Sequence, residues 1–130
     1  MTTLTDAQRA SLIDVAKSWL GTPWHPMAGQ TPARQVRVDC SNLVHAVYVE
    51  AGLSYVYADT ASFLRLAQFV HVEVPLPGDV VLFGGHLGIA TPNSVDGEMI
   101  SAHGSPTKPG VVRYGQISWF ADFKGYYCWR

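Results

Sequence analysis

The spacing of apolar residues changes once along the chain, and this change limits the possible folds more than any other feature. Before Pro75 apolar residues recur at helical intervals, and after Gly78 they gather in short β-prone runs separated by Gly, Pro, Asn and Asp. The spacing predicts helices over residues 6–20, from Ser41 to Gly52 and over 60–69, and strands over 80–83, 86–91, 98–103, 111–114 and 126–129. Because the helices precede the strands, we expect an α+β fold in which N-terminal helices pack on an antiparallel meander.

Specific residues mark the ends of the first two predicted helices. Thr5 followed by Gln8 is a capping-box pattern, and Gly21 ends the first helix. The second helical pattern stops at Gly52 and places Cys40 in or just before its first turn. A sulfur atom at this position would feel the positive end of the helix dipole.

The composition fits one soluble domain spanning residues 1–130. Hydrophobic residues make up 48% of the 130 residues, enough for a single core. Nine Lys and Arg against ten Asp and Glu give a net charge of −1, and the basic residues are scattered, so we expect no nucleic-acid partner and no binding to anionic membranes. The N-terminus lacks the basic and apolar segments of a secretory signal, and no run could span a bilayer, so we expect no membrane insertion and no export signal.

Two cysteines, Cys40 and Cys128, are far apart in the chain, and we expect both to be free thiols. Cys40 is the candidate nucleophile, because a helix start together with a nearby imidazole lowers the pKa of a thiol and produces reactive thiolate. His86, in the strand-like run Gly85–Ala90, is the candidate base. The pair predicts a cysteine hydrolase, which needs no metal or other cofactor.

A third site residue is expected on the predicted strand 98–103. Ser101 and His103 alternate along this strand and therefore project to the same side. We prefer His103, because a second imidazole can fix the tautomer and direction of the His86 ring. The same Cys40, His86 and His103 could instead hold zinc, although the usual short ligand spacings are missing.

Four short segments of the chain follow one another in a characteristic order. They are Gly21–Trp24, Asp39–Ser41, Pro77–Phe83 and His86–Ile89. Together they resemble the landmarks of the NlpC family of cell-wall cysteine peptidases, and the resemblance covers nearly the whole chain. It implies a papain-like α+β fold and hydrolysis of an amide bond in peptidoglycan stem peptides, in which Cys40 attacks the carbonyl and His86 is the base.

The resemblance also implies roles for residues beside the nucleophile. Asp39 and Ser41 would bind the amino end of the substrate, although Asp39 fits equally well as a helix cap. Trp24 stands where the family usually has a site tyrosine. Alignment with the family's Ile-His-Ala stretch would put Ser101 in the third site position, and we prefer His103 because it can orient the His86 imidazole from the same face.

Other functions stay open at this point. A thioester intermediate can be resolved by nucleophiles other than water, which would make the chain an acyltransferase or a deamidase. A non-catalytic copy of the fold would bind peptides or a partner protein instead. Because peptidoglycan lies outside the cytoplasm, the chain could be an effector injected by a delivery machine and restrained by an immunity protein, a phage enzyme, or a cytoplasmic recycler of cell-wall peptides.

Overall fold

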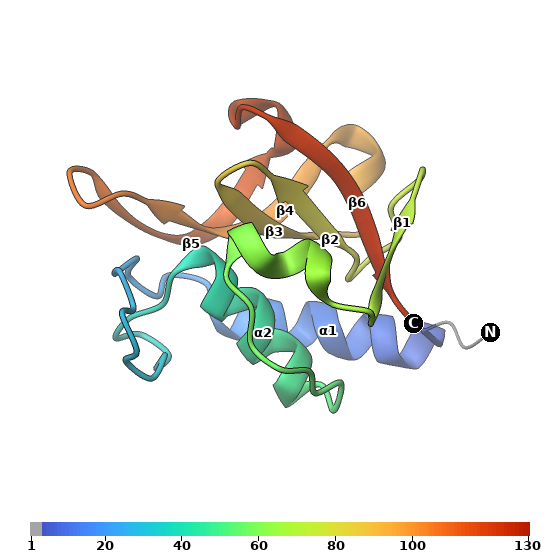
Figure 1. Ribbon diagram of the computed structural model, residues 1–130, viewed down its shortest axis with the longest axis horizontal. Coiled ribbons are helices and arrows are strands. Elements are labelled where there is room, and N and C mark those ends of the chain that lie inside the picture. Colours follow the sequence, from blue (N-terminus) through green and yellow to red (C-terminus); the bar gives the residue numbers. More distant parts are fainter. Residues whose placement is uncertain (1–3) are drawn as a thin grey trace.

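Two α-helices lie against one face of a six-stranded antiparallel sheet in the computed structural model, which describes residues 4–130 (Figure 1). The helices are α1 (Asp6–Ser18) and α2 (Cys40–Glu50), with short 3-10 helices η1 (Thr60–Arg65), η2 (Ser94–Asp96) and η3 (Ile117–Trp119). The strands are β1 (Phe69–Val72), β2 (Val80–Phe83), β3 (His86–Ala90), β4 (Glu98–Gly104), β5 (Pro109–Gln116) and β6 (Phe123–Trp129). The predicted α+β architecture is confirmed.

The strands are ordered β1-β6-β2-β3-β4-β5 across the sheet. Strands β2 to β5 form the predicted meander, each pairing with the next. The last strand does not extend this meander, because β6 returns to lie between β1 and β2 (Figure 1). Its aromatic residues contribute to both pairings, with Trp129 opposite Phe69 on β1 and Tyr127 opposite Val80 on β2. The expected meander is therefore wrong for this strand.

Alternation along the central strands divides the core into two clusters on opposite faces of the sheet. Val80 and Leu82 of β2 pack on the side of the helices, whereas Val81 and Phe83 face the other side. The helices contribute Leu12, Ile13 and Ala16 from α1 and Leu43, Val44 and Val47 from α2. The second face is covered by the segment around η3, so both faces of the central strands are buried.

Helix α1 begins as predicted and ends before the predicted boundary. The N–H of Gln8 donates to the Thr5 hydroxyl at 3.1 Å, and the Thr5 N–H donates to the Gln8 side chain at 2.8 Å, which confirms the capping box. At the other end the Trp19 N–H donates to the Ala16 carbonyl at 3.1 Å, a tight turn that closes the helix before Gly21 (φ +86°). Among the described residues, no helix has the length and apolar character needed to cross a membrane.

The predicted third helix, residues 60–69, is wrong in its second half. The helical part is Thr60–Arg65, a 3-10 helix, and Phe69 begins strand β1, which the sequence analysis missed. Phe69 is buried and packs against Phe63 and Trp129, with ring centroids 4.7 and 5.7 Å away. The pairing with β6 joins residues far apart in sequence, and it overrides the local helical spacing.

Candidate functional site

Cys40 is the first residue of α2, and Asp39 caps the helix. One carboxylate oxygen of Asp39, Oδ1, accepts hydrogen bonds from the backbone N–H of Asn42 at 3.0 Å and from its side-chain amide at 2.9 Å. The Ser41 hydroxyl donates to the same oxygen at 3.4 Å. The capping role predicted for Asp39 is thus confirmed, and it fixes the position of the cysteine at the positive end of the helix.

The sulfur of Cys40 lies in a buried environment with several hydrogen-bond donors. The Thr60 hydroxyl is 3.6 Å from Sγ. Burial raises the pKa of the Cys40 thiol, and the charge of Asp39 adds to this, while the Thr60 hydroxyl and the backbone N–H groups of Leu87 and Ser41 oppose it. The resting residue is therefore a neutral thiol whose ionised form has donors already in place.

His86 is the first residue of β3 and faces away from the helices. It pairs with Phe83 of β2, and its ring stacks on Phe120 with centroids 4.2 Å apart and an angle of 5° between the planes. Among residues 4–130 its Nε2 atom is buried and has no hydrogen-bond partner. Burial, together with the nearby His103, lowers the pKa of His86 to about 4, so the ring is neutral near pH 7.

His103 and Ser101 lie on β4, on the same side as His86. The β3–β4 pairing joins Ile89 with Ile100, and the same register continued along both strands brings His103 opposite His86. The two imidazoles meet edge-on, with centroids 6.1 Å apart, and no hydrogen bond joins them. The Nε2 atom of His103 and the hydroxyl of Ser101 are likewise buried without partners within residues 4–130.

One cleft of about 410 Å³ brings most of the predicted site residues together. It is lined by Trp24, Asp39, Cys40, Ser41, Tyr57, Asp59, Thr60, Ala61, Gly84, Gly85, His86 and Gly104. The candidate nucleophile, base and substrate-binding residues therefore line the same cleft. His103 and Ser101 do not line it; they lie behind His86, which is the place for a residue that orients the base.

Sequence reasoning missed three polar residues of the cleft, which come from the segment between α2 and β1. Tyr57 lies with its hydroxyl 2.7 Å from that of Ser41, Asp59 caps η1, and Thr60 contacts Cys40. Tyr57 and Asp59 also line an adjoining cavity of about 380 Å³. The available signal was the pair of polar residues Asp59 and Thr60, which follows the tyrosines at 55 and 57. No spacing rule links this segment to Cys40.

A zinc site built from Cys40, His86 and His103 has no support in the geometry. Within residues 4–130 no group of three or more His, Cys, Asp or Glu side chains is arranged to hold a metal ion. Both cysteines are free thiols, as predicted.

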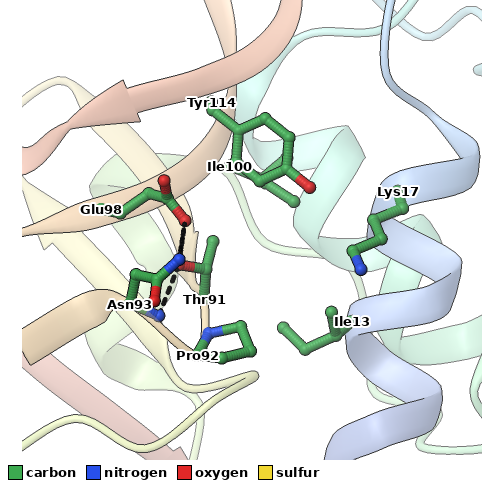
Figure 2. A pocket seen from close by; sticks show the side chains of 8 residues that line it. All are labelled: Ile13, Lys17, Thr91, Pro92, Asn93, Glu98, Ile100 and Tyr114. Atoms are coloured by element: carbon green, nitrogen blue, oxygen red, sulfur yellow. Dashed lines mark hydrogen bonds between the residues drawn. The ribbon is translucent and has the colours of Figure 1, made fainter.

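A smaller cavity of about 220 Å³ lies away from Cys40, between α1 and the sheet (Figure 2). Lys17 and Ile13 form one side, and Glu98 lies across from them, held by a 2.6 Å hydrogen bond from the Thr91 hydroxyl. Its lining contains no Cys, Ser or His, so it offers no nucleophile or imidazole base for hydrolysis. The predicted nucleophile and base, Cys40 and His86, line the other cleft instead.

Solved structures of other proteins share this arrangement of helices and strands. The NlpC/p60 domain of the peptidoglycan hydrolase SagA superposes with a TM-score of 0.68 over 94% of this chain and 98% of its own, at 21% sequence identity. The chain has the NlpC/P60 fold. The peptidoglycan hydrolase RipB of Mycobacterium tuberculosis matches with a TM-score of 0.71 over 96% of this chain and 67% of its own, at 19% identity.

A second mycobacterial protein has a similar structure, which supports the assignment of the NlpC/P60 fold. The P60 domain of an antigen from M. avium subspecies paratuberculosis has a TM-score of 0.71, 18% identity, and coverage of 94% of this chain and 93% of its own. No protein-family model matches the chain, and no curated protein does. The predicted papain-like NlpC resemblance is confirmed at the level of the fold.

Proposed function

We propose that the chain is a cysteine peptidase that hydrolyses an amide bond in peptidoglycan stem peptides. The observation that carries the proposal is the cleft that Cys40, at the start of α2, shares with His86, at the start of β3. Two proteins with the same fold, SagA and RipB, are named as peptidoglycan hydrolases, which supports the choice of substrate.

In the proposed reaction the Cys40 sulfur attacks the carbonyl carbon while its proton passes to His86. His86 then gives this proton to the amine nitrogen as the carbon–nitrogen bond breaks, and a thioester remains on the sulfur. A water molecule that loses its proton to His86 hydrolyses the thioester and restores the thiol. The neutral state of His86 near pH 7 is the one that a base needs.

We assign His103, rather than Ser101, the task of orienting His86. Its ring meets that of His86 edge-on, with centroids 6.1 Å apart. A small movement of either ring would let an N–H of one imidazole donate a hydrogen bond to a ring nitrogen of the other. Replacing His103→Asn should lower kcat by about 10²-fold and change the pH profile, since an oriented base contributes roughly 10²–10⁴-fold. Ser101→Ala is the matched variant on the same strand, and an equal loss there would transfer the role to Ser101.

The charges in the cleft suggest which end of the substrate it binds. Asp39 and Asp59 line both the cleft and the adjoining cavity, and neither space is lined by Lys or Arg. Carboxylates facing a cavity attract a cationic group, so we propose that the amino end of the peptide binds beside Asp39, Ser41 and Tyr57. Acetylation of that amine should raise KM in the wild type and have a smaller effect in Asp59→Asn.

The decisive experiment is mass spectrometry of peptidoglycan fragments after incubation with the purified chain. We expect the wild type to cut a stem-peptide bond and Cys40→Ala to leave it intact. Cys128→Ala removes the other free thiol and should cut normally, which makes it the matched control. Cutting by Cys40→Ala would contradict the proposed nucleophile, and transfer of the acyl group to an added amine in place of water would favour the acyltransferase alternative.

A further inference from the structure

The Thr60 hydroxyl is the side-chain group that contacts the Cys40 sulfur, at a distance of 3.6 Å. Among the described residues, the side-chain hydrogen bond of this sulfur is the one with Thr60, and none joins it to His86. We propose that Thr60 is a catalytic residue that stabilises the Cys40 thiolate by donating the hydrogen bond of its hydroxyl to the sulfur. This role rests on the proposed function of Cys40 as the nucleophile.

The backbone around Thr60 fixes the hydroxyl beside the sulfur. Thr60 is the first residue of η1, and the Asp59 carboxylate caps this helix by accepting a hydrogen bond from the Ser62 N–H at 2.9 Å. The β-branched side chain of threonine has few accessible rotamers, so a fixed backbone also limits where the hydroxyl points. The donor is therefore in place before the thiol ionises, which is the condition for effective electrostatic stabilisation.

The electrostatics of the cleft show why such a donor is needed. Burial raises the pKa of the Cys40 thiol, and the Thr60 hydrogen bond is the largest influence that lowers it. Before it accepts the thiol proton, His86 carries no positive charge beside the sulfur near pH 7, because its own pKa is about 4. A thiolate that has lost its proton to solvent therefore depends on neutral donors and on the helix dipole.

Other hydroxyls in the cleft are occupied. The Tyr57 hydroxyl is 2.7 Å from that of Ser41, and the Ser41 hydroxyl donates to Asp39. The Thr60 hydroxyl, by contrast, makes no hydrogen bond within residues 4–130 other than the one with Cys40. In the neutral thiol the S–H can donate to Thr60; after the thiol proton has passed to His86, the Thr60 hydroxyl keeps its own proton and turns it toward the sulfur.

The test is the pH dependence of Cys40 alkylation by iodoacetamide, measured in a Cys128→Ala background so that Cys40 is the one thiol present. A hydrogen bond to a charged group is worth more than one to a neutral group, and its loss in Thr60→Val should raise the apparent pKa by about one unit and slow alkylation about tenfold near pH 7. Thr60→Ser keeps the hydroxyl and should restore most of the rate. Ser62→Ala removes a hydroxyl from the same short helix and should react like the parent.

An unchanged alkylation profile in Thr60→Val would overturn the proposal. A profile that stays unchanged while peptide cleavage falls would also overturn it, and would assign the hydroxyl to the substrate oxygen instead. If Thr60→Val does not fold by circular dichroism, Thr60→Ala provides the same comparison. Alkylation requires no peptidoglycan, so a shifted profile in a chain that fails to cut peptidoglycan would support the role of Thr60 and contradict the proposed substrate.

Discussion

The imidazole of His86 lies parallel to the ring of Phe120, with centroids 4.2 Å apart and an angle of 5° between the planes. The His103 ring closes a second side, 6.1 Å away. This enclosure removes water from the imidazole, which disfavours its charged form and explains the lowered pKa of His86. Phe120, from the turn between η3 and β6, thereby influences the protonation of the candidate base.

Replacing Phe120→Ala should raise the pKa of His86 from about 4 toward its ordinary value of 6.5, because one face of the ring becomes hydrated. Titration of the His86 ring by NMR measures this directly, and the acid limb of the kcat/KM profile should move in the same direction. Phe123→Ala is the control, since this exposed ring packs against Phe83 and Tyr126 rather than His86. An unmoved His86 titration in Phe120→Ala would contradict the prediction.

The same burial of His86 should make the fold less stable in mild acid. Its pKa is about 4 in the folded chain and 6.5 in the unfolded one, so between these values the unfolded state binds the proton more readily. The contribution of His86 to the free energy of unfolding is fully present above pH 6.5 and is lost as the pH drops toward 4. The loss amounts to about 3 kcal/mol. The lowered pKa of His103 acts in the same direction.

Urea unfolding at pH 7 and pH 4.5 measures this effect. His86→Gln should reduce the difference in the free energy of unfolding between pH 7 and pH 4.5. His25→Gln, which removes an exposed loop histidine, is the control and should leave this difference unchanged. A His86→Gln variant that loses stability as steeply as the wild type on acidification would show that other groups cause the loss.

The ion pair between Arg9 of α1 and Asp79, just before β2, should contribute strongly to stability. The Arg9 guanidinium lies 2.7 Å from the Asp79 carboxylate, and both residues are buried, at 8% and 1% exposure. Arg9→Met would leave a buried carboxylate without its cation, at a cost of about 3–5 kcal/mol in the free energy of unfolding. Lys124→Met breaks the exposed pair with Asp122 and should cost less than about 1 kcal/mol in the same urea experiment.

Local patterns predicted the parts of this fold that depend on neighbouring residues. The capping box at Thr5 and Gln8 and the start of the second helix at Cys40 follow from side chains three to four positions apart, and both are confirmed. Runs such as Val80–Phe83 were equally clear, because a buried strand shows its apolar residues without interruption. Similar local patterns, a cysteine at a helix start and a histidine in a strand, identified Cys40 and His86 as candidate site residues.

Long-range pairings explain what the sequence could not predict. Strand β1 exists because Phe69–Val72 pairs with β6, and this partner is distant in sequence. Thr60 and Tyr57 reach the cleft because the segment after α2 folds back over its N-terminus, which no periodicity indicates. The stacking of Phe120 on His86 depends in the same way on where η3 crosses the sheet.

Gly104, at the end of β4, should be indispensable to the wall of the cleft formed by Trp24. Its φ of +152° is strained for other residues, and a Cβ atom there would lie 2.7 Å from Trp24 Cγ and 2.8 Å from the Gly110 nitrogen. Gly104→Ala should therefore destabilise the fold by about 1–3 kcal/mol and displace the indole. Urea unfolding gives the stability, and Trp fluorescence reports the displacement. Gly85→Ala, in the same cleft with no atom within 4 Å of the new methyl group, should lose no stability; equal losses in the two variants would mean that contact with Trp24 is not the cause.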